Sequence, residues 1–264
     1  MNINKNNFTE IEARLKEEAT LRLNYSENQI YSKFKSKITI KLASIFVFLS
    51  LKFNIKPNTI TFIYIIAVFF AFLLISFGTN IFILLGLIIY FFKNSLDNTD
   101  GHLARITNNT SQLGHILDIW AGFFSFILFQ TSIYFYVFNN TDDKFYIFAA
   151  IFILILYCID FKKHYLSIKN ESPNESKSFT LVKDNISDEF LSMFKTPIKI
   201  LSLIDYDGRS RYTDFVILII LIEVLFNQIF LSPMFCIVWF FTCVGKFSFK
   251  FYLTIKNLKN EKNK

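Results

Sequence analysis

The chain has 264 residues, of which 53% are hydrophobic and 19% aromatic, and its mean hydropathy is +0.39. Several apolar stretches approach the length of about 20 residues that a helix needs to cross a bilayer, so the composition indicates an all-α, multi-pass integral membrane protein. The formal net charge of +7 does not indicate nucleic-acid binding. The basic residues gather in connections and tails, where anionic headgroups and positive-inside orientation account for them.

Residues 1–54 form a polar arm ahead of the first predicted crossing. Apolar residues recur at a spacing of four between positions 11 and 23, which predicts a short amphipathic helix on the aqueous side. The stretch 31–51 begins with lysines and continues apolar, a pattern typical of a helix in the headgroup region. A seventh crossing is the alternative, disfavoured because Lys41 and Lys52 bound too few apolar residues.

Six crossings are predicted after this arm, within a membrane domain of residues 55–256 that is followed by a charged tail of residues 257–264. Pro57 lacks an N–H and restricts the residue before it, so a helix is expected to begin there. Polar or turn-forming residues separate the later crossings. The predicted crossings are 59–77, 81–97, 113–138, 145–159, 215–231 and 234–255.

An even number of crossings places both termini on one side of the membrane. Lys144 is the one Lys or Arg among the short connections on the opposite side. Because cytoplasmic connections carry the excess of Lys and Arg, we expect the termini and the connection between the second and third crossings to face the cytoplasm.

Ionisable residues gather around this connection, where they are expensive at the edge of a membrane and suggest a functional site. If the segment is helical, Asp97 and Asp100 share a face, and Asp118 follows in the next crossing. Gly101 leaves room for a large phosphorylated ligand, and Arg105 offers a planar fork suited to a diphosphate. Oxygen-only ligands suit a hard cation such as Mg²⁺ or Mn²⁺ better than zinc.

The spacing of these residues resembles the signature of the CDP-alcohol phosphatidyltransferase family, Asp-x2-Asp-Gly-x2-Ala-Arg-x8-Gly-x3-Asp-x3-Asp. The last family aspartate is replaced by Gly122 in this chain. The stretch 55–61 also resembles the family's Pro-Asn-x-Ile-Thr entry to its first transmembrane helix. A plain proline-initiated helix with Asn and Thr caps is the alternative for that stretch. The positions in register with the signature are Asp97, Asp100, Gly101, Ala104, Arg105, Gly114 and Asp118.

The resemblance implies transfer of a phosphatidyl or phospho-alcohol group from a CDP-alcohol, such as CDP-diacylglycerol, to a hydroxyl acceptor that itself can be phosphorylated. CMP is the other product, and phospholipid or glycolipid synthesis is the implied context. A bacterial cytoplasmic membrane is the expected location, and a homodimer is compatible because dimers are common in the family. The resemblance implies that Asp97, Asp100 and Asp118 bind Mg²⁺ or Mn²⁺. The substrate-binding residues that it implies are Asn58, Thr61, Gly101, Arg105 and Ser111.

Gly122 leaves open which group accepts the hydroxyl proton, a role that the resemblance gives to the missing aspartate. His115 is one candidate, since it shares a predicted helical face with Asp118 and position 122; an ordinary interfacial histidine is the alternative. An acceptor that is already ionised, or a water in the vacated space, would also serve. The rival function is a protein that binds CDP-lipid without turnover. A transporter is disfavoured because the acids lie at a helix end instead of the midplane.

Two further features lie near the fifth predicted crossing. Arg209 and Arg211 precede it and are candidates for binding an anionic acceptor, with positive-inside anchoring as the alternative. Glu223 lies inside it, and there we expect a helix–helix hydrogen bond instead of a role in the reaction.

Overall fold

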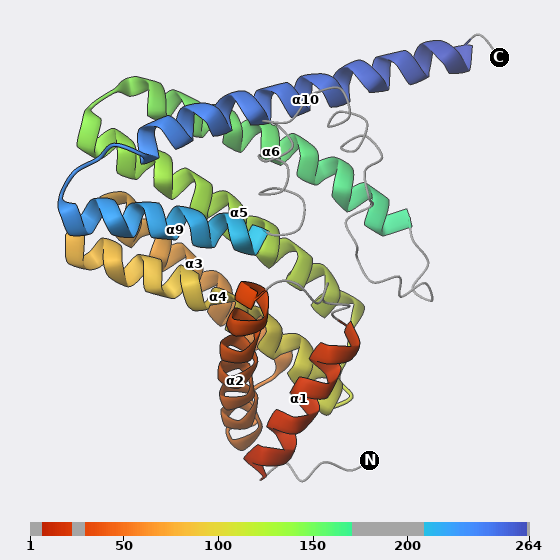
Figure 1. Ribbon diagram of the computed structural model, residues 1–264. Coiled ribbons are helices and arrows are strands. Elements are labelled where there is room, and N and C mark those ends of the chain that lie inside the picture. The colour runs from red at the N-terminus through yellow and green to blue at the C-terminus, as the bar shows by residue number, and fades with distance from the viewer. Residues whose placement is uncertain (1–6, 23–29, 171–208, 263–264) are drawn as a thin grey trace. The chain divides into compact units, whose positions relative to one another are not determined.

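A computed structural model describes residues 7–22, 30–170 and 209–262 of the chain. Within these ranges the secondary structure is helical and contains no strands, in agreement with the all-α prediction (Figure 1). The helices are α1 (Phe8–Arg22), α2 (Ile30–Lys52), α3 (Pro57–Phe77), α4 (Asn80–Ile106), α5 (Gln112–Thr141), α6 (Lys144–Asn170), α9 (Arg209–Phe226) and α10 (Ser232–Lys262).

Four of the described helices are long and apolar enough to cross a membrane. They are α3, α4, α5 and the Ser232–Phe249 part of α10, while Lys144–Ile159 of α6 is a shorter apolar helix. These helices support a multi-pass membrane protein. The count of six crossings and the interfacial placement of α1 and α2 stay predictions.

Helix α4 runs beyond the predicted end of the second crossing at Asp97 and finishes at Ile106. Its end is marked by Asn108, whose φ of 52° is left-handed. The Asn109 N–H donates to the Ala104 carbonyl oxygen at 2.8 Å, the bond that closes a Schellman cap. The first part of the acidic motif, from Asp97 to Arg105, therefore lies on one continuous helix, and Asp118 follows on α5.

The chain folds as two compact units. The N-terminal arm and the acidic motif belong to the first, whereas α6, α9 and α10 belong to the second. Helices α3, α4 and α5 contribute to both. The first unit comprises Met1–Leu74 and Leu85–Phe129, and the second comprises Ile75–Leu84 and Gln130–Lys264.

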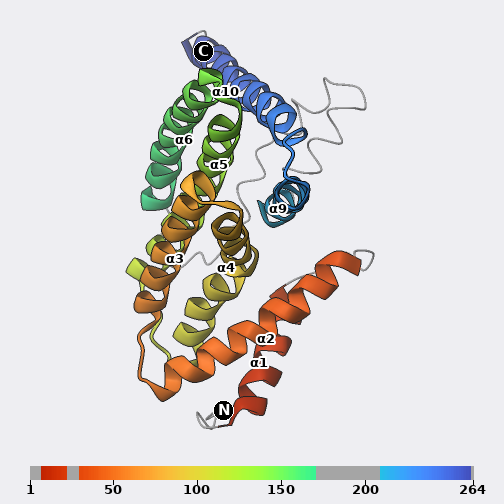
Figure 2. The same ribbon diagram turned by 90° about the vertical axis from the view of Figure 1, so that its left-hand side faces the viewer.

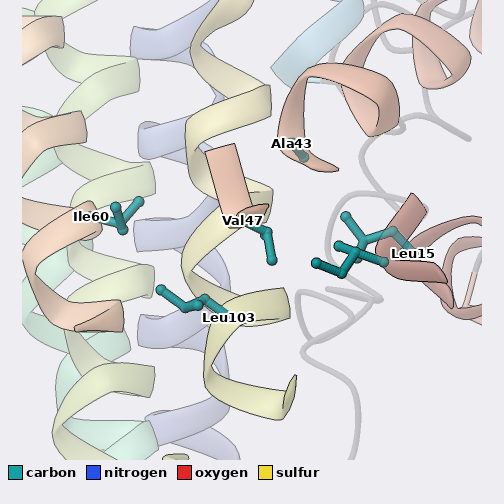
Figure 3. Packing of buried hydrophobic residues seen from close by; sticks show 6 residues of the cluster. Leu15, Ala43, Val47, Ile60 and Leu103 are labelled. Atoms are coloured by element: carbon teal, nitrogen blue, oxygen red, sulfur yellow. The ribbon is translucent and has the colours of Figure 1, made fainter. Parts of the chain in front are cut away.

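A buried apolar cluster in the first unit joins the N-terminal arm to the helix that carries the motif. Helix α1 packs against α2 (Figure 2), and both contribute side chains to the cluster (Figure 3). Leu103, which lies inside the motif, is fully buried there. The α4 part of the motif thus buries Leu103 in an apolar cluster and carries Asp97 and Asp100 as its acidic residues. The cluster consists of Ile11, Leu15, Ala43, Val47, Ile60 and Leu103.

In the second unit a buried carboxylate holds the connection between α9 and α10. Glu223 is 1% exposed, and its Oε1 accepts hydrogen bonds from three successive backbone N–H groups. The expected structural role of Glu223 agrees with these contacts, although its partners belong to a connection instead of a neighbouring helix. The donors are Phe230 at 3.1 Å, Leu231 at 2.7 Å and Ser232 at 2.8 Å.

Candidate active site

Three helices of the first unit carry polar residues at helical spacing. Within each helix the residues are three, four or seven positions apart and so share one face. They are Asn58, Thr61 and Tyr64 on α3; Lys93, Asp97 and Asp100 on α4; and Asp118 and Ser125 on α5, with Gly122 between the last two.

Thr61 and Asp100 join α3 to α4 through a buried hydrogen bond. The Thr61 hydroxyl donates to Asp100 Oδ2 at 2.5 Å, and the Gly101 N–H donates to Asp100 Oδ1 at 2.6 Å. Asp100 is only 6% exposed and Thr61 only 2%. The threonine of the Pro-Asn-x-Ile-Thr stretch therefore contacts an acid of the main motif directly, which the alternative of simple helix capping does not include.

The three predicted metal ligands are close enough to interact electrostatically with common neighbours. Asp100 and Asp118 repel one another, and both of them, together with Asp97, act on the buried hydroxyl of Tyr64. Asp100 is buried, Asp97 is half-buried and Asp118 is exposed. A bound cation would relieve the repulsion between such neighbouring acids.

The donor chemistry of the three acids fits a hard divalent cation, because carboxylate oxygens are the ligands that Mg²⁺ and Mn²⁺ prefer. The described residues nevertheless include no group of three or more His, Cys, Asp or Glu side chains arranged to hold a metal ion as they stand. We therefore assign no coordination geometry.

Arg105 folds back along α4 toward the acids. A Cβ placed on Gly101 would lie 3.2 Å from Arg105 Nη1, so the guanidinium lies in close contact with the glycine face of the helix. Arg105 Nη2 lies 2.9 Å from His102 Nδ1. The guanidinium also attracts Asp100 and Asp118. The motif thus brings one permanent cation beside its carboxylates.

The entry to α3 meets the start of α5. A Cβ on Gly114 would lie 3.1 Å from Asn58 Oδ1 and 3.1 Å from Ser111 Oγ. The Gly114 N–H donates to Ser111 Oγ at 3.0 Å, so Ser111 is the N-cap of α5. Asn58 and Ser111, both predicted to bind substrate, are therefore neighbours across a glycine that leaves no room for a side chain.

Three polar residues behind the acids were missed in the sequence. Lys93, which is 7% exposed, donates to Ser125 Oγ at 2.9 Å, and Ser125 is also hydrogen-bonded to Tyr64. These contacts link α3, α4 and α5. Helical projection could have found all three, since each lies one or two turns from a motif residue on the same face.

The structure also describes His115, the proposed proton acceptor, and position 122, where the family signature has an aspartate. His115 is exposed, and only its backbone N–H has a recorded bond, to the Ser111 carbonyl oxygen at 3.1 Å. A Cβ on Gly122 would meet nothing within 4 Å. Position 122 is thus open space. The side chains of Arg209 and Arg211 lie outside the described residues, so their predicted role stays a prediction.

Comparison with known proteins adds one finding. The family model for CDP-alcohol phosphatidyltransferase matches residues 54–168, from just before α3 to near the end of α6. No curated protein and no solved structure matches the chain. Enzymes of this family transfer phosphatidyl or phospho-alcohol groups from a CDP-alcohol to a hydroxyl acceptor and generally depend on a divalent metal. The match confirms the resemblance carried by the acidic motif, and over residues 54–168 the chain is similar to CDP-alcohol phosphatidyltransferases.

Proposed function

We propose that this protein transfers a substituted phosphate group from a CDP-alcohol, such as CDP-diacylglycerol, to a hydroxyl acceptor and releases CMP. The reaction depends on Mg²⁺ or Mn²⁺ and serves phospholipid or glycolipid synthesis at the cytoplasmic face of a bacterial membrane. The observation that carries the proposal is the buried Thr61–Asp100 bond, which joins the two family motifs in one site.

The chain's residues divide the work in this proposal. Asp97, Asp100 and Asp118 bind the cation, which supplies positive charge to the diphosphate and its leaving phosphate. Arg105 and the backbone at Gly101 contact the diphosphate on the same face. The nucleotide occupies the corner lined by Asn58, Thr61 and Ser111.

In the transfer step the acceptor oxygen attacks the phosphorus that carries the donor alcohol. The new P–O bond forms as the P–O bond to CMP breaks, and the acceptor hydroxyl gives up its proton to a base. His115 fills that role in our proposal, since position 122 carries no carboxylate. An acceptor that already exists as an oxyanion would not need it.

The rival function is a membrane protein that binds CDP-lipid without turnover, and the open position at Gly122 favours it. The decisive measurement is CMP release from CDP-diacylglycerol by purified protein in nanodiscs, with Mg²⁺ or Mn²⁺ and a panel of alcohols. We expect CMP release that requires both an acceptor and a metal and that stops with EDTA. Tight CDP-lipid binding without CMP release, whatever the acceptor, would establish the rival.

The proton acceptor has its own test. We expect His115→Gln to lower turnover about 10²-fold, the size of effect that general bases contribute. Because a side chain at position 122 meets no obstruction, the double variant H115Q/G122D should recover most of this loss. A His115→Gln variant with unchanged turnover would remove His115 from the mechanism and leave the transferase proposal intact.

A further inference from the structure

His102 is not one of the fixed residues of the family signature, but it lies on α4 between two of them, Gly101 and Ala104. It follows Gly101 directly and lies one turn before Arg105 on α4. Its side chain is only 7% exposed. A polar ring buried this well needs hydrogen-bond partners, and the recorded partner is the guanidinium of Arg105, at 2.9 Å from Nδ1.

The chemistry of the two side chains determines which of them donates the hydrogen bond. A guanidinium has five N–H donors and no acceptor, so in this bond Arg105 donates and Nδ1 of His102 accepts. Nδ1 therefore carries no proton, and the imidazole is the neutral tautomer with its proton on Nε2. His102 is a neutral acceptor for a permanent cation.

Two other features influence where the Arg105 guanidinium lies. Asp100 and Asp118 attract it electrostatically, while the absence of a side chain at Gly101 allows it to lie along the helix. A carboxylate partner would orient Arg105 but cancel much of its charge toward an anionic ligand. A neutral imidazole orients it and leaves the charge in place.

We propose that His102 is a positioning residue that holds the Arg105 guanidinium against the Gly101 face of α4, ready for the donor's diphosphate. The inference rests on the proposed function, because it assumes that Arg105 meets the diphosphate. It adds the residue that keeps the arginine oriented without neutralising it. The expected ligand class is a pyrophosphate-linked nucleotide, and the cytidine base is not involved in this contact.

The test measures CDP binding by two variants of His102. One variant keeps a hydrogen-bond acceptor where Nδ1 lies in the wild type, and the other does not. In His102→Asn the side-chain oxygen falls near that place, whereas in His102→Gln it falls near the place of Nε2. Full-length protein in detergent is titrated with CDP and, separately, with cytidine. We expect His102→Asn to bind CDP within about threefold of the wild type and His102→Gln to lose about tenfold, the size typical of a hydrogen bond to a charged group. Cytidine affinity should be the same for both.

A double-mutant cycle separates positioning from a general structural role. In an Arg105→Met background, His102→Gln should have no further effect on CDP binding, because there is no guanidinium left to hold. If the loss persists in that background, or if cytidine binding falls equally, His102 acts on the fold and the inference is overturned.

The outcomes also distinguish the two proposals. Wild-type protein that binds CDP with the expected pattern of variants but releases no CMP would support the role of His102 and overturn the transferase. Wild-type protein that releases CMP while His102→Gln binds CDP normally would overturn the role of His102 alone. Wild-type protein that neither binds CDP nor releases CMP would overturn both.

Discussion

The two units of the molecule bury carboxylates in opposite ways. Glu223 in the second unit receives three backbone N–H donors on a single oxygen. Asp100 in the first unit receives one hydroxyl and one N–H, and it faces the like charge of Asp118. Three backbone donors thus meet at one oxygen of Glu223, whereas Asp100 has one donor for each oxygen and a like charge nearby. The contacts of Glu223 hold the connection between α9 and α10, and the acids around Asp100 are the ones that we propose to bind a cation.

The largest expected effect comes from removing one of the gathered charges. We expect Asp100→Asn to lower CMP release by at least about 10²-fold, because a metal ligand contributes several kcal/mol to stabilising the developing charge. The unfolding free energy should change little, since the amide oxygen still accepts from Thr61 and the repulsion from Asp118 disappears, which offsets the loss of the acceptor for the Gly101 N–H. CMP release and thermal unfolding in the same micelles measure both.

Asp142 supplies the matched control for this change. It is exposed on the connection after α5, and its φ of 55° is one that asparagine also adopts readily. Asp142→Asn should leave both activity and stability unchanged. Equal losses of stability in the two variants, or an active Asp100→Asn enzyme, would break the contrast between the two kinds of carboxylate.

The second effect should fall on stability alone. Glu223→Leu leaves three backbone N–H groups without their acceptor, so we expect the unfolding free energy to drop by about 2–4 kcal/mol. Glu223→Gln retains an oxygen at the same place and should lose less than half as much. The specific activity of the folded fraction is expected to stay within twofold, as followed by CMP release after urea titration. A loss of chemistry greater than the loss of folded protein would make Glu223 part of the reaction.

The smallest effect compares two glycines of α5. Gly114→Ala places a methyl group 3.1 Å from Asn58 Oδ1 and Ser111 Oγ, so we expect CDP affinity to fall about tenfold as these side chains move. Gly122→Ala meets nothing and should instead raise the unfolding free energy by about 0.5–1 kcal/mol, the usual gain of alanine over glycine in a helix. Isothermal titration and thermal unfolding distinguish the two. An unaffected Gly114→Ala variant would remove the α3–α5 corner from the nucleotide site.

The sequence predicted the parts of the site that depend on spacing along one helix. Asp97, Asp100 and Arg105 were placed together because the motif repeats at helical intervals, and the structure keeps them on α4. The contact of Thr61 with Asp100 was not predicted, because no local rule pairs residues 39 positions apart and the family resemblance gave the two residues only as members of the substrate and metal sites.

Contacts that cross between helices were the ones that sequence reasoning missed. Lys93 and Ser125 meet across α4 and α5, and neither belongs to the family signature. The bond between Arg105 and His102 was also overlooked, although its spacing of three residues is visible in the sequence. The sequence predicted the second crossing as 81–97, and α4 continues beyond that crossing to Ile106, where Asn108 takes a left-handed φ of 52°.

Leu103 connects the segment that matches the family model to the N-terminal helices. The family match begins at residue 54, yet Leu103 and Ile60 inside it pack against Ile11, Leu15 and Val47 ahead of it. The segment that matches the family model therefore packs, through Ile60 and Leu103, against residues of α1 and α2 that lie ahead of the match. The position of the helix that carries Asp97 and Asp100 thus depends in part on these two helices.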